Sequence, residues 1–400
     1  MWRKIPRNVW AASLASFLTD VSSEMVQNLV PLFLANALGV GSAVIGLVEG
    51  VAEALASLLK VASGALSDRL GRRKGLAVFG YLLSALSKIG FAVATAWPHV
   101  ALARWGDRLG KGVRTAPRDA LIADSIEEGR RGLAFGLHRA ADTAGALVGV
   151  LAALAAVAWV QGREPLLLAA TFRRIALWAL LPAFLAVAAL ALLAEEPRSE
   201  RRRPGPPPAG PRGLGRGFWV FLGLVAVFEL SNSADAFLAL RAQTLGADVV
   251  EILAMLALFN LVYAALSTPA GALSDRVPRK AVILAGWTVY ALVYLGAALA
   301  ASRTAMWAVY AVYGLYYGVA YGTTRALVAD LVPEDRRGTA YGAYATVVGL
   351  MAFPASFVAG LLWDAYGPAA PFFFSGGLAL LAALGLLLWR PPSPHAKRPG

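Results

Sequence analysis

Residues 64–69 read Gly-Ala-Leu-Ser-Asp-Arg, and residues 271–276 repeat the same six residues 207 positions further along the chain. Basic residues follow each copy closely, and each copy stands between two long apolar stretches. A second repeat keeps nearly the same offset, because the segment RDALIAD that begins at Arg118 matches RALVAD, which begins at Arg325. Similarity at such a period indicates two related halves arranged in the same order.

Apolar segments long enough to cross a bilayer fill most of the chain. Of the 400 residues, 58% are hydrophobic, and the mean hydropathy of +0.61 exceeds that of a soluble domain. About 20 apolar residues in a helix cross the roughly 30 Å of hydrocarbon. Ala and Leu dominate over β-branched residues, which favours helices over strands. We therefore expect an all-α membrane protein with twelve transmembrane helices, near residues 9–37, 42–66, 75–96, 98–124, 132–158, 167–194, 217–241, 249–273, 280–301, 305–331, 338–362 and 369–390.

The net charge of +13 lies mostly at the two termini and in alternate loops. Cations cluster after the second and eighth segments and between the sixth and seventh, whereas the other loops carry few. The positive-inside rule then predicts a multi-pass protein of the cell (inner) membrane with both termini in the cytoplasm. This topology, with attraction to anionic lipid headgroups, explains the basic charge without a nucleic-acid partner.

A segment rich in Pro, Gly and Arg separates the two halves. Residues 195–217 read EEPRSERRRPGPPPAGPRGLGRG, which cannot bury apolar surface. We expect an N-terminal six-helix bundle at residues 1–194, a cytoplasmic linker at 195–217 and a C-terminal six-helix bundle at 218–400.

The loop after the second segment carries the pattern Gly-x-x-x-Asp-Arg-x-Gly-Arg-Arg/Lys. Its residues are Gly64, Asp68, Arg69, Gly71, Arg72 and Arg73. The copy in the second half keeps Asp275 and Arg276 but has Pro278 in place of the second glycine. In the fourth segment, Arg108 and Gly112 match a weaker pattern, Arg-x-x-x-Gly. On these residues the chain resembles the major facilitator superfamily over essentially its whole length, and its drug/proton antiporter-like branch in particular.

The resemblance implies two pseudo-symmetric six-helix bundles that give alternating access to a central site. The expected partners are a small-molecule substrate and protons, with membrane lipids around a monomer. The resemblance also implies a gating role for the loop motif. The carboxylate of Asp68 can cap the positive end of a neighbouring helix and pair with an arginine, which would latch the cytoplasmic side.

The direction of transport depends on a motif that is only partly present. Residues 145–149 read Gly-x-x-x-Gly, as in the fifth segment of many family exporters, but Val150 replaces the proline that follows in that motif. We expect proton-coupled export (antiport) of a small organic solute. The alternative is a proton-linked symporter that imports a small polar or anionic metabolite, since arginines suit carboxylate or phosphate. A non-transporting receptor or scaffold is an alternative of another class.

Charged residues lie inside the apolar segments, mostly in the first half. A charge at the bilayer centre costs roughly 2.5–3.5 kcal/mol, so these residues must face each other or a wet cavity. Asp20, Glu24 and Gln27 share one face of the first segment at i, i+4 and i+7. The carboxylates expected to couple protons are Asp20, Glu24, Glu49 and Glu53. The alternative is a permanent network of buried ion pairs that holds the first half together.

His138 and Asp142 lie one turn apart in the fifth segment and form a further candidate for proton coupling. Histidine titrates near neutrality, so this pair could relay protons. The alternative is a buried histidine whose hydrogen bonds are satisfied.

The expected substrate cavity combines a basic stripe of the fourth segment with polar and aromatic residues of the second half. Tyrosines on one face of the tenth segment suit an amphiphilic or cationic organic substrate, although they also suit ordinary helix packing. The candidate cavity residues are Gln27, Asn28, Lys60, Arg104, Arg108, Lys111, Glu229, Asn232, Asp235, Tyr313, Tyr317, Tyr321 and Arg325.

No catalytic constellation appears in the sequence. The absence of cysteine excludes disulfides and thiolate metal sites. No phosphate loop of the form Gly-x-x-x-x-Gly-Lys-Ser/Thr is present, so ATP does not drive the protein directly. We therefore expect no enzyme activity, no cofactor and no metal site.

Overall fold

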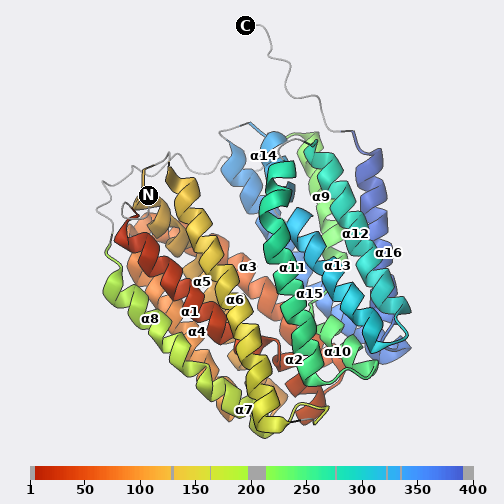
Figure 1. The fold of residues 1–400 in the computed structure, drawn as a ribbon. Coiled ribbons are helices and arrows are strands. Elements are labelled where there is room, and N and C mark those ends of the chain that lie inside the picture. Colours follow the sequence, from red (N-terminus) through yellow and green to blue (C-terminus); the bar gives the residue numbers. More distant parts are fainter. Residues whose placement is uncertain are drawn as a thin grey trace, which may run out of the picture.

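The computed structural model describes residues 5–127, 130–162, 164–196, 213–274, 277–320, 323–333 and 336–390, and its regular elements there are all helices (Figure 1). Asp275, Arg276 and Tyr321 lie outside the described residues, as does most of the predicted linker. The fold class expected from the sequence, an all-α membrane protein, is confirmed.

The first half of the chain forms six membrane segments, of which the first and sixth are interrupted. Their helices are α1 (Arg7–Gln27), α2 (Val30–Leu32) with the π-helical turn η2 (Phe33–Ala37), α3 (Ser42–Leu70), α4 (Arg73–Val93), α5 (Trp97–Asp124), α6 (Arg131–Gln161), α7 (Ala169–Trp178) and α8 (Leu180–Leu193).

The second half also forms six membrane segments. Its first segment is interrupted, and its fourth is described in two parts on either side of residues 321 and 322, which lie outside the described residues. Its helices are α9 (Arg216–Ser231), α10 (Ala236–Thr244), α11 (Val249–Ser274), α12 (Arg279–Leu299), α13 (Arg303–Ala320), α14 (Thr323–Asp330), α15 (Arg337–Tyr366) and α16 (Ala370–Leu388).

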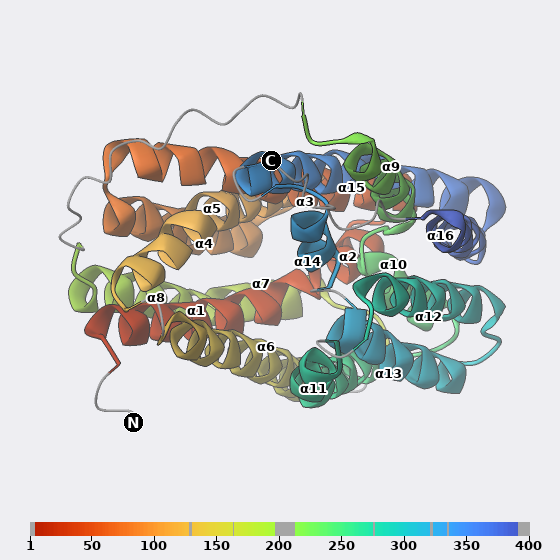
Figure 2. The same ribbon diagram turned by 90° about the horizontal axis from the view of Figure 1, so that it is seen from above.

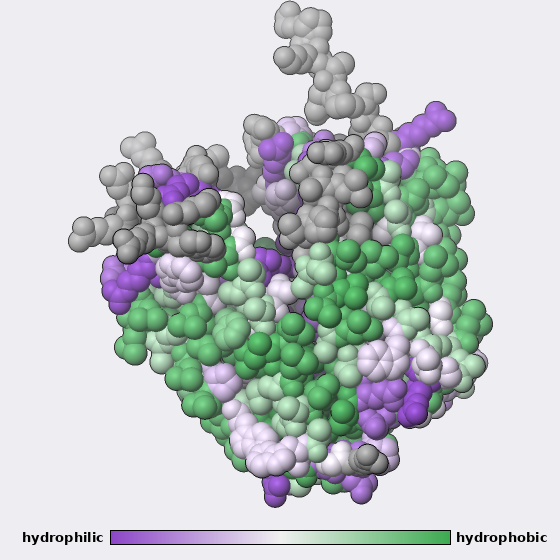
Figure 3. Space-filling model, in the orientation of Figure 1, coloured by the Kyte–Doolittle hydropathy of each residue, from purple (hydrophilic) through white to green (hydrophobic). Residues whose placement is uncertain are grey.

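Nine helical segments in the described part of the chain are long and apolar enough to cross a membrane by length and composition. The other three of the twelve predicted segments are α1 with α2 and η2, α5, and α13 with α14. These three carry many of the charged and tyrosine residues that the sequence places inside the membrane. Figure 3 shows apolar surface along the sides of the molecule, where lipid chains would pack.

Two pairs of helices form most of the contact between the halves, and α2 packs on α10 over a smaller area. Within the first half α1 packs on α6 and α8, and α5 packs on α3 and α4. Within the second half α11 packs on α13, and α16 packs on α9 and α12. Across the halves, α3 lies along α15 and α6 lies beside α11, as Figure 2 shows from above.

Glycines let α3 and α15 touch backbone to backbone. A Cβ atom on Gly46 would lie 2.2 Å from the carbonyl oxygen of Ser356, and one on Gly360 would lie 2.3 Å from the carbonyl oxygen of Ser42. Only residues without a side chain permit so close an approach of two membrane helices. The interface between these two helices, here called the α3–α15 seam, is therefore tightly packed near the start of α3 and the end of α15.

The halves are closed at one end of the molecule and separated at the other. At the closed end, the ring of Phe237 on α10 of the second half packs against α3 of the first, since a Cβ atom on Gly46 would lie 3.3 Å from that ring. The surface is hollowed between the halves at the opposite end, where α1 begins and α16 ends (Figure 3).

Equivalent ion pairs occur in both halves. Arg73 at the start of α4 lies 3.3 Å from Asp124 at the end of α5, and Arg279 at the start of α12 lies 2.6 Å from Asp330 at the end of α14. Both members of the second pair lie 206 positions after those of the first. The repeat in the sequence is thus a repeat of specific contacts.

Candidate functional site

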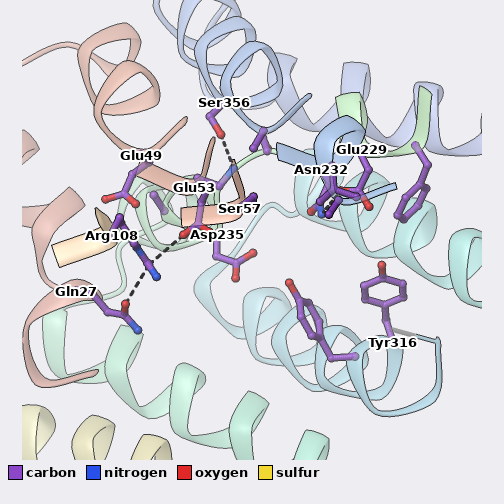
Figure 4. A pocket seen from close by; sticks show the side chains of 18 of the residues that line it. Gln27, Glu49, Glu53, Ser57, Arg108, Glu229, Asn232, Asp235, Tyr316 and Ser356 are labelled. Carbon is purple, nitrogen blue, oxygen red and sulfur yellow. Dashed lines mark hydrogen bonds and ion pairs between the residues drawn. The ribbon is translucent and has the colours of Figure 1, made fainter. Parts of the chain in front are cut away.

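A cavity of about 360 Å³ lies between the two halves (Figure 4). Its walls come from α1, α2, α3 and α5 on one side, and from α9 to α15 on the other. The sequence-predicted candidates that line it are Gln27, Asn28, Glu49, Glu53, Lys60, Arg104, Arg108, Glu229, Asn232, Asp235, Tyr317 and Arg325.

Other predicted candidates lie outside this lining, namely Asp20, Glu24, Lys111, His138, Asp142 and Tyr313. Tyr313 is buried behind the wall, where its hydroxyl donates to the carboxylate of Asp235. Lys111 lies on the same helix as Arg104 and Arg108 but is not among the residues that line the cavity in this conformation. For these two residues a direct role in the cavity wall stays a prediction.

Arg104 and Glu49 form a buried ion pair between α5 and α3. The Nε atom of Arg104 lies 3.1 Å from both carboxylate oxygens, and Nη2 lies 2.6 Å from Oε2. Both residues are 4% exposed. Each charge is neutralised by the other, which is the condition under which a membrane interior accepts them.

Arg108 forms the second ion pair of this wall, with Glu53. Its Nη2 lies 3.0 Å from Oε1 of Glu53 and donates to Oε1 of Gln27 at 3.1 Å. Arg104 donates to the same oxygen of Gln27 at 3.4 Å. The Nε of Arg108 is buried and has no hydrogen-bond partner among the described residues, so the cavity wall keeps one unused donor.

The far side of α5 carries another buried pair. Lys88 of α4 places its Nζ 2.8 Å from Oδ1 of Asp107, and the side chain of Lys88 is 2% exposed. The same ammonium donates to Oγ of Ser23 on α1 at 3.4 Å. This contact fixes the rotation of α5 that turns Arg104 and Arg108 toward the cavity.

Two glutamates occupy equivalent places in the first and seventh segments. Glu24 accepts hydrogen bonds from the amides of Gln27 and Asn28, and Glu229 accepts one from the amide of Asn232 at 3.3 Å. In each case an amide three residues further on binds the carboxylate, just before the segment is interrupted. Neither glutamate has a cationic partner within 4 Å in the described structure. Both are half-buried acids whose printed hydrogen bonds come from neutral amides and not from a cation.

The interruption of the seventh segment brings polar backbone into the cavity wall. Residues 232–235 separate α9 from α10, and their freed backbone groups find partners on other helices. Tyr290 donates to the carbonyl of Ser231 at 3.0 Å, and Tyr294 donates to that of Ser233 at 3.2 Å. The N–H of Ala234 donates to Oγ of Ser356 at 3.1 Å. Hydroxyl groups therefore replace the hydrogen bonds that a continuous helix would make.

His138 and Asp142 lie close together but are not hydrogen-bonded in this conformation. Nε2 of His138 lies 3.7 Å from the carboxylate, and neither ring nitrogen has a hydrogen-bond partner among the described residues. A histidine with satisfied hydrogen bonds is therefore not what this conformation contains, and the proton relay stays a prediction.

The loop motif holds the α3–α4 hairpin together. Gly71 ends α3 with a φ of 62°, a left-handed conformation that glycine adopts without strain. Arg73 lies 2.6 Å from Asp68 and also reaches Asp124. Asp68 does not cap a helix in this conformation, since its side chain is 71% exposed. The carboxylate at the N-terminus of α4 belongs instead to Glu196, which accepts from the backbone N–H of Arg73.

Sequence reasoning missed several residues of the cavity wall. Phe228, Trp287, Tyr316, Tyr344 and Ser356 line it but carry no motif. Four of the five residues at 231–235, namely Ser231, Asn232, Ser233 and Asp235, are poor helix formers, a signal that would have located the interruption. Among the described residues, no three His, Asp or Glu side chains lie together in a way that could hold a metal ion.

Comparison with known proteins identifies the family. The model of the major facilitator superfamily (MFS) matches residues 12–238 and 217–400. An uncharacterized MFS-type transporter of Methanocaldococcus jannaschii is 36% identical over 391 residues, which cover 96% of this chain and 95% of that protein. The methyl viologen resistance protein SmvA of Salmonella typhimurium is 31% identical over 137 residues, 32% of this chain and 27% of that protein.

Solved structures share the fold. The crystal structure of the nucleoside transporter NupG superimposes with a TM-score of 0.79 at 12% identity, covering 95% of this chain and 99% of that one. At this identity the likeness concerns the fold alone. With a family model that spans nearly all of the chain, twelve membrane segments and a cavity between two related halves, this multi-pass membrane protein belongs to the major facilitator superfamily of secondary transporters.

Proposed function

We propose that this transporter couples the movement of protons to the export of a small organic solute. The halves at residues 1–194 and 218–400 would rock about the cavity, exposing it alternately to the two sides of the cell membrane. The positive-inside distribution of charge supports cytoplasmic termini, and with them a cavity that is open to the cytoplasm in this conformation.

The observation that carries the proposal is the equivalent pair Glu24 and Glu229. Both carboxylates are bound only by neutral amides. Burying an unpaired carboxylate is costly, and binding a proton removes that cost, whereas access to water restores the ionised form. A carboxylate whose surroundings alternate between wet and dry states is therefore a proton carrier.

Two of the other acidic candidates are less suited to this role. Glu49 and Glu53 are neutralised by Arg104 and Arg108. A proton that bound to either carboxylate would leave a buried arginine without its counter-ion. We assign these pairs to holding the first half together.

Two observations support export as the direction of transport. Gly145 and Gly149 keep part of the fifth-segment motif of exporters. The local similarity to a methyl viologen resistance protein also favours export, because resistance follows from removal of the compound. Proton-linked import of an anionic solute is the second candidate, favoured by Lys60 and Arg325 in the cavity wall.

Proton binding can be measured without a known substrate. Purified protein in liposomes on a solid-supported membrane should give a transient current when the external pH is stepped, because protons enter a site within the membrane. Glu24→Gln and Glu229→Gln should each reduce the displaced charge, and the double variant should abolish it. Glu164→Gln, which changes an exposed loop carboxylate, is the matched control. A current equal to that of empty liposomes would contradict proton coupling.

The direction has a separate test in cells. A strain that expresses the chain should tolerate more methyl viologen than one that expresses the Glu24→Gln, Glu229→Gln double variant. Normal proton currents without any gain in tolerance would count against export of this compound.

A further inference from the structure

Four charged residues of the cavity wall have no ion-pair partner. Once the pairs Arg104–Glu49 and Arg108–Glu53 are set aside, the charged residues that remain in the lining are Lys60, Glu229, Asp235 and Arg325. None of them forms an ion pair among the described residues. The wall therefore carries two acidic and two basic residues that are not ion-paired within the described part of the chain.

Asp235 forms one charged end of the cavity, which is here called the negative pole. It lies at the interruption between α9 and α10, and its Oδ1 accepts a hydrogen bond of 2.6 Å from the buried hydroxyl of Tyr313. Figure 4 shows Asp235 beside Glu53 of the opposite wall. Because Glu53 is already bound by Arg108, Asp235 is the carboxylate that remains available to a ligand at this depth.

Lys60 and Arg325 form the positive pole. Lys60 lies seven residues beyond Glu53 on α3, about 10 Å along the helix axis toward the open end. Arg325 is contributed by α14 of the other half and lines the same cavity. Glu229, on α9 of the same half, also lines the cavity and is bound by the amide of Asn232.

The sequence repeat shows how this pole arises. In the first half, Arg118 is bound by its neighbour Asp119 at 2.8 Å. The matching segment of the second half, RALVAD against RDALIAD, lacks a counterpart of that aspartate. Arg325 is thus the copy whose local counter-ion is missing, so its counter-charge has to come from elsewhere.

Aromatic side chains complete the wall of the cavity. Phe228, Trp287, Tyr316 and Tyr317 line it from the second half. The rings of Phe228 and Trp287 stack with centroids 4.5 Å apart, which makes a flat apolar surface. Such a surface suits the uncharged body of an organic molecule.

We propose that the cavity takes a zwitterionic organic solute, with its cationic group at Asp235 and its anionic group between Lys60 and Arg325. A ligand with only one kind of charge would leave the opposite pole uncompensated in a low-dielectric site. A single anionic group between two cations would also remove their repulsion, which must otherwise grow when the open end closes. The inference rests on the proposed function only in taking this cavity as the transport site.

Three matched probes test the proposal. Trialanine is a zwitterion whose charges lie about 10 Å apart when extended. Trialanine amide keeps only the cation, and N-acetyl-trialanine keeps only the anion. Binding to the full-length protein in detergent, at fixed pH, is measured by the rise in melting temperature with probe concentration. Trialanine should bind about tenfold more tightly than either derivative, the scale of one charged hydrogen bond.

Substitutions in the cavity wall test which residue binds each charged group of the probe. Asp235→Asn should remove the preference for trialanine over its N-acetyl form, and Lys60→Met should remove the preference over the amide. Glu164→Gln and Lys74→Met, which change charges outside the cavity, are the controls. Equal binding of the amide would overturn the proposal in favour of a cationic solute, and equal binding of the N-acetyl form would overturn it in favour of an anionic one.

Lack of binding by all three probes would also overturn the proposal. This assay uses no proton gradient, so its failure is distinct from a failure of proton coupling. The pH-step currents would persist if the cavity carries protons with a solute of another class.

Discussion

The carboxylate of Asp364, near the end of α15, accepts a hydrogen bond of 2.9 Å from the backbone N–H of Ser42, the first residue of α3. Its second oxygen accepts from the N–H of Ala43, also at 2.9 Å. A carboxylate of the second half thus caps a helix of the first half at the closed end of the molecule. Any conformation that opens this end must break both hydrogen bonds.

Asp364→Ala should shift the protein toward conformations that are open at this end. Loss of a helix cap costs about 1 kcal/mol, which corresponds to about a fivefold change in the ratio of conformations. Because the chain has no cysteine, spin labels can be placed on single introduced cysteines, for example at Leu168 and Tyr366. Double electron–electron resonance should show a larger population of long distances between the two labels. An unchanged distance distribution would contradict a role of Asp364 in holding this end closed.

Gly46→Ala should have a similar effect by a steric route. The added Cβ would lie 2.2 Å from the carbonyl of Ser356, so α3 and α15 would have to separate. The same pair of spin labels should report longer distances. Gly75→Ala is the matched control, since a Cβ there meets nothing within 4 Å. If the two variants behave alike, the close seam does not control the opening.

Glu49→Gln should destabilise the first half strongly. The change leaves Arg104 buried with no counter-ion, and breaking a buried pair in this way costs about 3–5 kcal/mol. The thermal unfolding temperature in detergent should fall well below that of the wild type. The double variant Glu49→Leu, Arg104→Met should recover most of the loss, because it removes both charges. A melting temperature of Glu49→Gln equal to the wild type would show that water already compensates Arg104.

Tyr294→Phe should destabilise the interruption of the seventh segment. The hydroxyl of Tyr294 is buried and donates to the carbonyl of Ser233, which would be left without this donor at a cost of about 1–3 kcal/mol. Tyr341→Phe on α15, where the side chain is exposed, serves for comparison. Equal melting temperatures for the two variants would mean that the tyrosine does not support the interruption.

The sequence predicted the membrane segments well, because their length and apolar character follow from the thickness of the bilayer. It did not reveal where the segments are interrupted. Pro117 and Pro354 lie inside the continuous helices α5 and α15. The seventh segment is interrupted with no proline at all, at residues held by hydroxyls of α12 and α15. Those partners are distant in the sequence, so no local pattern could reveal them.

The sequence predicted only part of the candidate site, for a similar reason. Helical spacing placed Glu49 and Arg104 within the membrane, but the rotation of each helix decided that they bind each other. Spacing also put His138 and Asp142 one turn apart without placing them within hydrogen-bond distance. The contacts of Asp364 and Glu196 join segments far apart in the sequence, and neither residue belongs to a motif.

The equivalent pairs Arg73–Asp124 and Arg279–Asp330 have a mechanical consequence. Each ties the start of one membrane helix to the end of the next at the open end of the molecule. Because of these ion pairs, we expect the third and fourth segments to move together as one rigid unit. The same holds for the ninth and tenth segments. The relative motion of the two halves must then occur where no such ion pair connects the helices, along the α3–α15 and α6–α11 seams.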